Sequence, residues 1–392
     1  MSDEPTLSCG RVLSLLCWFL MLSLSGCDTS STLPVCDAVS RQVVERISSG
    51  RFRGLSLARE GDDLYALWSR PEGSFLRPLA PNGAPRGRAL RWGPACPGGM
   101  DALSGSPLVV ACATAGAPNQ AKPGRLLLFQ LRGGERQGAG LTVTSLEGFG
   151  EGVQLARADE RIIIAWHDSS QGGAEAWRSE TDSDLRQVSA PEQISSPRVS
   201  AGPPHIYIDG DVPLLIWAET WLRNGRNVGQ IVLQRGDDVP QRVSEASFGF
   251  PRPQVTRDRA GLVVGFRDVQ RPLRQAGLYL QRLDERLRPV GLPRRTGRAD
   301  GRGAPILRTC GDTLFTAAPR SRTDAMSIGI GGFNQDLQRV VAQSQVYEAE
   351  RRFNDVAALC LDGRLLLLAA EEWTAEHPTA RLITLRLSCD QG

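Results

Sequence analysis

Short apolar runs recur along the chain at a nearly constant interval. The runs end at Trp68, Cys112, Trp166, Trp217, Phe266, Ala317 and Ala369, and successive ends are 44, 54, 51, 49, 51 and 52 residues apart. A near-constant period of about 50 residues indicates one supersecondary unit that is copied along the chain. The sequence therefore predicts a repeat architecture of seven units.

Each unit shows the same internal pattern of apolar and polar positions. In residues 253–297, the alternating segment PQVTRD is followed by a turn, the run GLVVGFRD, a polar loop, the segment GLYLQRLDE and a last strand near PRRTG. Alternation with a period of two predicts strands, and Asp-Gly pairs at 209–210 and 362–363 are typical of tight hairpin turns. Each unit is therefore expected to form a four-stranded antiparallel meander.

Four-stranded units of this length resemble the blades of a β-propeller of the WD40 and sialidase-like superfamily. The resemblance covers residues 37–392 and concerns architecture, because the chain lacks the WD dipeptide, the kelch double glycine and the sialidase Asp-box. It implies an all-β, seven-bladed β-propeller. Two alternatives remain, a pair of β-sandwiches and a six-bladed ring with an additional hairpin.

The last unit has only three strands of its own. Its segments DVAALCL, RLLLLAA and ARLITLRL are followed by the end of the sequence, whereas RQVVERISS at residues 41–49 resembles the fourth strands of other units. We expect this N-terminal segment to complete the last blade and close the ring. Cys36 and Cys389 should then lie near one hairpin end and form a disulfide.

The remaining cysteines also favour disulfide bonds. Cys9 and Cys17 precede residue 27, and the six beyond it are Cys36, Cys96, Cys112, Cys310, Cys360 and Cys389. An even number in an exported chain favours disulfides, although six cysteines allow 15 pairings. Cys310 and Cys360 end first strands of adjacent units and should pair, which leaves Cys96 with Cys112. No CxxC pair is present and His167, His205 and His377 lack metal-ligand spacing, so we predict neither metal nor cofactor.

The N-terminal segment predicts export and lipid attachment. Residues 12–24 (VLSLLCWFLMLSL) are thirteen largely apolar residues, too few for a membrane span of about 20. Leu24-Ser25-Gly26-Cys27 resembles the bacterial lipobox, which implies a signal peptide at 1–26, diacylglycerol and palmitate on Cys27, and a tether at 27–36. The protein is then a membrane-anchored lipoprotein of the cell envelope, in the inner or the outer membrane. Ordinary secretory cleavage beside an incidental cysteine is the alternative.

Charge excludes one class of partner and suggests one site. The formal net charge is +3, and removal of Asp3, Glu4 and Arg11 with the signal leaves +4, which is too small an excess to indicate nucleic-acid binding. Between residues 286 and 308 the chain is locally basic, and Arg294, Arg295 and Arg298 are candidate ligands for a lipid phosphate or an acidic envelope polymer. A solvated outer strand explains the same run.

Acidic residues recur two positions beyond the ends of the apolar runs. Asp168, Glu219, Asp268 and Glu371 occupy equivalent places, and the same loops hold Glu372, Trp221 and Trp373. These residues are expected to surround the mouth of a central channel and to bind a cation, a sugar or a basic peptide. A structural role, in which an acid hydrogen-bonds its own turn, is the alternative.

The sequence indicates binding more than catalysis. It contains no HExxH, GxSxG or P-loop motif. We therefore expect a monomeric, lipid-anchored scaffold or binding protein that uses one propeller face for an envelope protein or glycan. An envelope glycan hydrolase of sialidase-like type is the second interpretation and requires paired carboxylates in one pocket. A structural spacer is the third.

Overall fold

The computed structural model describes most of the chain from Cys36 onward. The described ranges are 36–48, 51–114, 124–146, 150–169, 174–224, 226–246, 252–268, 277–297, 305–321, 326–349, 353–371 and 379–389. The predicted signal peptide, Cys27, Arg298, Glu372, Trp373 and His377 lie outside these ranges. Within them every regular element is a strand, and no helix long and apolar enough to cross a membrane was found there.

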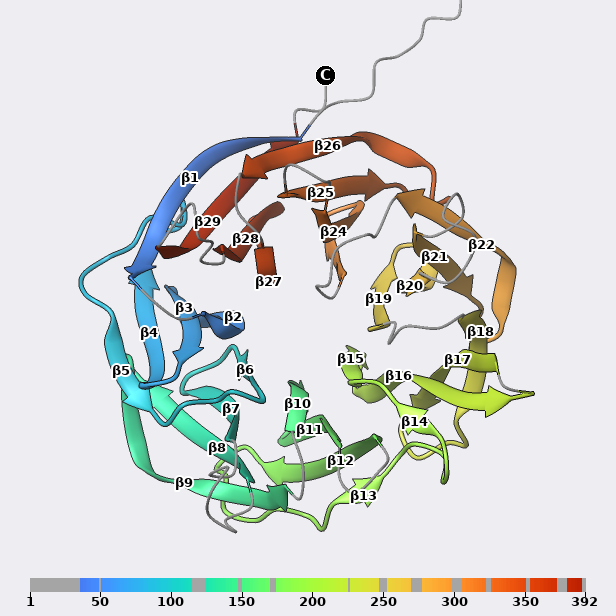
Figure 1. Ribbon diagram of the computed structural model, residues 1–392, viewed down its shortest axis with the longest axis horizontal. Coiled ribbons are helices and arrows are strands. Elements are labelled where there is room, and N and C mark those ends of the chain that lie inside the picture. Colours follow the sequence, from blue (N-terminus) through green and yellow to red (C-terminus); the bar gives the residue numbers. More distant parts are fainter. Residues whose placement is uncertain are drawn as a thin grey trace, which may run out of the picture. The chain divides into compact units, whose positions relative to one another are not determined.

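The strands form seven antiparallel sheets, the blades, which follow one another in chain order (Figure 1). Blade 1 consists of β2 (Arg53–Glu60), β3 (Asp63–Arg70), β4 (Gly73–Leu79) and β5 (Leu90–Gly93). Blade 2 consists of β6 (Gly99–Leu103), β7 (Leu108–Thr114), β8 (Gly124–Arg132) and β9 (Glu135–Leu146). Blade 3 consists of β10 (Gly150–Ala158), β11 (Arg161–Asp168), β12 (Glu175–Asp182) and β13 (Glu192–Gln193).

The fourth blade divides its inner edge between two short strands. Blade 4 consists of β14 (Ser200–Ala201) and β15 (His205–Asp209), which both pair with β16 (Val212–Arg223), then β17 (Arg226–Arg235) and β18 (Gln241–Ala246). Blade 5 consists of β19 (Gln254–Asp258), β20 (Gly261–Asp268), β21 (Gly277–Leu283) and β22 (Pro289–Gly297). Blade 6 consists of β23 (Ile306–Cys310), β24 (Thr313–Ser321), β25 (Met326–Phe333) and β26 (Arg339–Ala349).

The last blade takes its outer strand from the N-terminal side of the chain. It consists of β27 (Phe353–Leu361), β28 (Arg364–Glu371) and β29 (Ala380–Cys389), with β1 (Cys36–Ile47) paired antiparallel to β29. The register places Val43 opposite Ile383 and Cys36 opposite Cys389. The predicted closure is confirmed, and the closing strand begins five residues earlier than expected. The side chains of Cys36 and Cys389 lie outside the described ones, so their disulfide stays a prediction.

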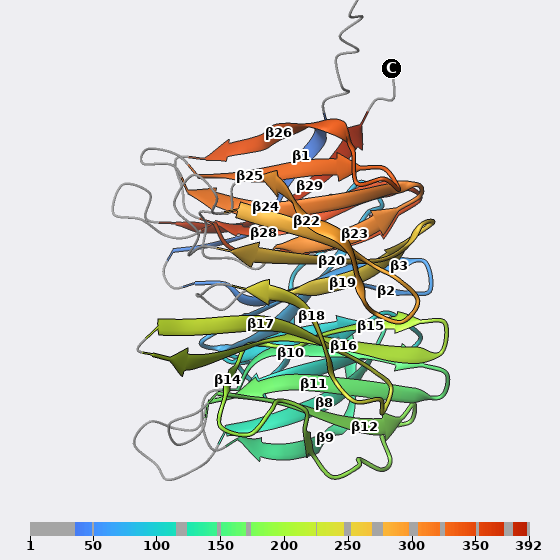
Figure 2. The same ribbon diagram turned by 90° about the vertical axis from the view of Figure 1, so that its right-hand side faces the viewer.

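The seven innermost strands surround a common axis. Each of β2, β6, β10, β15, β19, β23 and β27 contacts the next, and β27 contacts β2, which completes the ring (Figure 1). Seen from the side, the strands run between the two faces of the ring (Figure 2). The structure thus confirms a seven-bladed β-propeller.

The apolar core is divided among the junctions between blades. Seven clusters of buried side chains each join two neighbouring blades. Because successive side chains of a strand point to opposite faces, Ala66 and Trp68 of β3 pack toward blade 7, whereas Tyr65 and Leu67 pack toward blade 2. Trp68 is fully buried and stacks on Phe75, with ring centroids 6.1 Å apart. Burial of both faces explains why the second strands read as continuous apolar runs.

Two of the predicted disulfides are present. Cys310 at the end of β23 is bonded to Cys360 on β27, with Cα atoms 5.6 Å apart, and therefore links the inner strands of blades 6 and 7. Cys96 is bonded to Cys112 of β7, with Cα atoms 5.2 Å apart. Both pairings agree with those expected from the sequence.

Candidate functional site: the axial cavity

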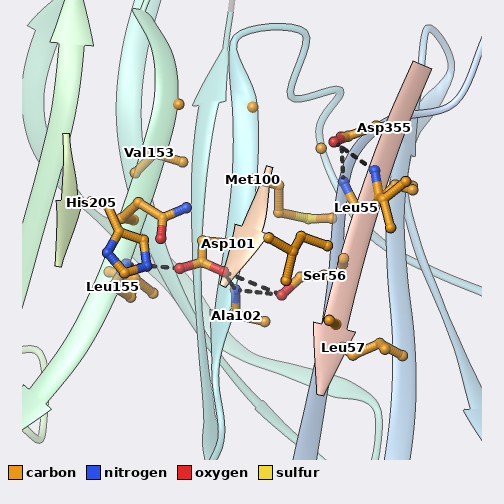
Figure 3. Close-up of a pocket in the computed structure, with 18 of the residues that line it drawn as sticks. Leu55, Ser56, Leu57, Met100, Asp101, Ala102, Val153, Leu155, His205 and Asp355 are labelled. Carbon is orange, nitrogen blue, oxygen red and sulfur yellow. Dashed lines mark hydrogen bonds between the residues drawn. The ribbon is translucent and has the colours of Figure 1, made fainter. Parts of the chain in front are cut away.

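A cavity of about 810 Å³ lies along the axis of the ring. All seven blades contribute to its wall through their first strands and the segments that lead into them. Figure 3 shows part of this wall, where β-strands from separate blades bring Ser56, Asp101, His205 and Asp355 to one space. These residues are far apart in the sequence, and the ring alone places them together.

One layer of the wall is predominantly polar. In every blade the first strand pairs with the second strand, whose apolar run ends at a buried residue such as Trp68 or Trp166. The residue just before that run end has a pairing partner on the first strand. In chain order these partners are Ser56, Asp101, Gln154, His205, Gln254, Leu307 and Ala357. Five of these seven residues are polar, and all five line the cavity. We call these five, Ser56, Asp101, Gln154, His205 and Gln254, the polar layer.

Asp101 is held at the junction of three blades. Its Oδ1 accepts hydrogen bonds from the Ser56 hydroxyl at 3.2 Å and the Ala102 N–H at 2.9 Å, and its Oδ2 accepts one from the Leu155 N–H at 2.8 Å (Figure 3). Burial raises the pKa of Asp101 to about 6, although these hydrogen bonds and the nearby charge of Arg308 act in the opposite direction. Asp101 therefore changes its charge close to neutral pH.

His205 and Arg308 share the electrostatic environment of Asp101. His205 is 5% exposed, and burial, together with the charge of Arg308, lowers its pKa to about 3. The imidazole is consequently neutral at physiological pH, and its Nδ1 is buried without a hydrogen-bond partner among the described residues. Burial also lowers the pKa of Arg308, while Asp101 raises it.

A second carboxylate, Asp355 of β27, lies across the junction between blades 7 and 1. Its Oδ2 accepts a hydrogen bond from the Leu55 N–H at 3.3 Å, and its Oδ1 accepts one from the Val356 N–H at 3.0 Å (Figure 3). Burial raises the pKa of Asp355, whereas these bonds and the charge of Arg252 lower it. The cavity thus holds two carboxyl groups whose pKa values are raised.

Arginines outnumber acids in the wall of the cavity. The arginines are Arg51, Arg53, Arg252, Arg257 and Arg308, and the acids are Asp101 and Asp355. One arginine is neutralised from outside the wall, because Arg257 binds both oxygens of Asp209 at 2.5 and 2.8 Å. Among the described residues, the wall therefore holds more arginines than acids. No group of three or more potential metal ligands occurs in the described part of the chain.

The acidic residues singled out in the sequence occupy other places. Asp168, Glu219, Asp268 and Glu371 are buried, and none of these four described residues lines the axial cavity. Glu219, 1% exposed, accepts hydrogen bonds from the Ser196 N–H at 2.7 Å, the Trp217 indole at 3.1 Å and the Gln230 amide at 2.9 Å. This carboxylate therefore joins neighbouring segments within the ring.

Glu371 helps to hold the closing strand. Its fully buried side chain forms ion pairs with Arg381 of β29 at 2.6 Å and with Arg41 of β1 at 3.4 Å. The three residues come from three adjacent strands of blade 7. Glu371 thus connects the N-terminal strand to the rest of the blade.

The aromatic and basic candidates that the structure describes lie away from the cavity. Trp221 is half-buried on β16, opposite Val228 of β17. Arg294 and Arg295 are exposed on β22, the outermost strand of blade 5. This placement agrees with the alternative of a solvated outer strand.

The first strands carry the cavity residues that sequence reasoning missed. Asp101, His205 and Gln254 had a detectable signal, since each is a polar residue at an equivalent place in the first strand of its unit. Arg308 lies one position beyond this layer in blade 6.

Known proteins resemble this chain in fold. No protein-family model matches it, and no curated protein is similar to it in sequence. A PL25 ulvan lyase bound to -[GlcA(1-4)Rha3S]- aligns with a TM-score of 0.55 and 9% identity over 86% of this chain and 95% of that one. The polysaccharide lyase Uly1 aligns with a TM-score of 0.54 and 10% identity over 88% of this chain and 99% of that one.

A weaker likeness exists to a subtype N10 neuraminidase-like protein of A/little yellow-shouldered bat. Its TM-score is 0.47 and its identity is 9%, over 90% of this chain and 100% of that one. At such low identities these similarities describe the propeller fold alone.

Proposed function

We propose that this protein binds a glycan in its axial cavity. The observation that carries the proposal is the cavity itself, whose volume of about 810 Å³ falls within the range of small-ligand sites and whose wall presents the polar layer. Serine, glutamine and histidine side chains donate and accept hydrogen bonds, as saccharide hydroxyls require. The two aligned polysaccharide lyases, which act on glycans, lend support at the level of fold.

Binding of defined oligosaccharides to the full-length protein in detergent tests this function. Gln154→Trp introduces a large ring into the polar layer and should abolish binding. Gln137→Trp, on the exposed outer strand β9, is the matched control and should bind as the wild type does. Unchanged binding by the Gln154→Trp protein, or no glycan retained by the wild type, would refute the proposal.

A glycan hydrolase is the second candidate, and the raised pKa of Asp101 favours it. A carboxyl group with a pKa of about 6 could act as a general acid, and Asp355 would supply the second carboxyl. The two aligned polysaccharide lyases, as enzymes that act on glycans, support this candidate at the level of fold. We place binding first because both oxygens of Asp101 already accept hydrogen bonds within the blade junctions. Release of reducing ends by the wild type, and its loss in Asp101→Asn, would reverse this preference.

We further propose that the protein acts at the surface of a membrane of the cell envelope through lipid on Cys27. The support is the lipobox-like sequence Leu24-Ser25-Gly26-Cys27 that follows the apolar segment. Cys27→Ala should abolish palmitate labelling and release the protein into the soluble fraction. Labelling that persists in this variant would contradict lipid attachment at Cys27.

A further inference from the structure

Arg308 is a cation in the cavity wall with few partners. Its Nη1 donates a hydrogen bond to the Leu307 carbonyl at 3.0 Å, and this is the only hydrogen bond of its guanidinium to the described residues. No ion pair within 4.0 Å joins it to a carboxylate in the described part of the chain. Guanidinium has five N–H donors, and a partly buried cation without a close counter-ion is costly. The guanidinium of Arg308 therefore has N–H donors available to bind an anion.

The described neighbours of Arg308 provide no hydrogen-bonded counter-ion for its guanidinium. Asp101 attracts Arg308, yet its oxygens are engaged by Ser56, Ala102 and Leu155. His205 is neutral and carries no positive charge that would compete for the anion. Its buried Nδ1, without a partner among the described residues, provides one more polar atom for a bound group.

We propose that the glycan bound in the axial cavity carries a carboxylate or sulfate group, which pairs with the guanidinium of Arg308 beside His205. This inference rests on the proposed glycan-binding function and narrows it to acidic saccharides. Guanidinium matches both anions with two parallel hydrogen bonds, and such charge-assisted pairs are stronger than neutral ones. The described wall also holds more arginines than acids, which agrees with an anionic ligand.

The same geometry makes binding depend on pH. Ionised Asp101 competes with the anion for Arg308 and repels it, and this competition ends as Asp101 takes up a proton. Asp355, near Arg252, acts with the same sign because burial raises its pKa also, and His205 stays neutral throughout. A sulfated saccharide, whose own charge is constant, should therefore bind more tightly at pH 5 than at pH 7.5.

Calorimetric titration of the full-length protein in detergent tests the inference. The probes are a glucuronate-containing tetrasaccharide, its carboxyl-reduced neutral form, a sulfated tetrasaccharide and its desulfated form. Arg308→Gln should weaken binding of the acidic probes by about 10- to 100-fold, the range for loss of a hydrogen bond to a charged group, and should weaken binding of the neutral forms less. Arg364→Gln, at an exposed arginine, is the matched control. The probe that loses more affinity identifies carboxylate or sulfate as the anion.

The outcomes separate this inference from the proposed function. Equal affinity of the wild type for acidic and neutral probes would overturn the inference and leave glycan binding intact. No binding of any probe would overturn both. If Arg308→Gln unfolds, Arg308→Lys and the pH dependence of the wild type decide the matter. Lysine keeps the charge but not the paired donors, so unchanged affinity for sulfate in that variant, or affinity that does not rise at low pH, would refute the proposal.

Discussion

Replacement of Asp101 by asparagine should change how the stability of the propeller depends on pH. The pKa of Asp101 is about 6 in the folded protein, whereas its ordinary value is 3.8. Burial thus disfavours the charged form of Asp101. The contribution of protonated Asp101 to the free energy of unfolding is fully present below pH 3.8 and is lost as the pH rises through 6. This difference in pKa corresponds to about 3 kcal/mol over the whole range.

The accessible part of this effect is smaller. Between pH 5 and pH 7.5 the linkage relation assigns Asp101 a loss of about 1.4 kcal/mol, and partial contact with cavity solvent reduces this to about 1 kcal/mol. His205 acts with the opposite sign, because its lowered pKa makes the protein more stable as the pH rises from about 3 to 6.5. Both proteins contain His205, so only the difference between them isolates Asp101.

Urea unfolding of both full-length proteins, at intervals from pH 5 to pH 7.5 in one detergent, measures this difference. The free energy of unfolding of the wild type relative to Asp101→Asn should fall by about 1 kcal/mol across the interval. Asp362→Asn, in an exposed turn, makes the same chemical change and should show no such trend. A wild-type stability that stays constant relative to Asp101→Asn, or rises with pH, would refute the assignment of the raised pKa to Asp101.

Three further predictions concern the buried carboxylates and the ring closure. Glu219→Ala should lower the free energy of unfolding by about 2–3 kcal/mol in urea titrations, since it leaves the Trp217 indole without its acceptor; a loss under 0.5 kcal/mol would contradict this role. Glu371→Gln should cost about 2 kcal/mol and speed amide hydrogen exchange in β1, because Arg41 loses its counter-ion; unchanged exchange in β1 would argue against the connection. Non-reducing peptide mapping should recover Cys36 joined to Cys389, and free thiols at both would rule the bond out.

The blade number and the ring closure could be predicted because they depend on local pattern and period. Runs that are apolar on both faces mark strands buried between two sheets, and their spacing counts the blades. The missing fourth strand of the last unit identified the strand that closes the ring, and Cys310 with Cys360 followed from their equal positions in adjacent units. Each of these inferences needs only the comparison of equivalent positions in successive repeats.

The sequence predicts the acidic candidates at the channel mouth because each follows an apolar run, and strand geometry explains why they are buried and do not line the axial cavity. Side chains two residues apart on a strand share a face. Glu219 therefore points to the same side as Trp217, and its carboxylate accepts a hydrogen bond from that indole. A side chain two residues beyond a buried aromatic residue therefore lies in the junction between blades. A carboxylate that is buried there needs hydrogen-bond donors.

The first strands converge on the axis, and their polar side chains have two distinct roles. Acceptors on three of them receive an N–H from the first strand of the next blade: Asp101 from Leu155, Gln254 from Leu307 and Asp355 from Leu55. This recurring bond satisfies backbone donors that no sheet can pair at the inner edge, and it explains the polar residues there. Arg308 follows Leu307 directly, yet its side chain takes part in no such bond to a neighbouring blade among the described residues. The requirements of the junctions therefore account for the acids of the cavity but leave its central cation to be explained by a ligand.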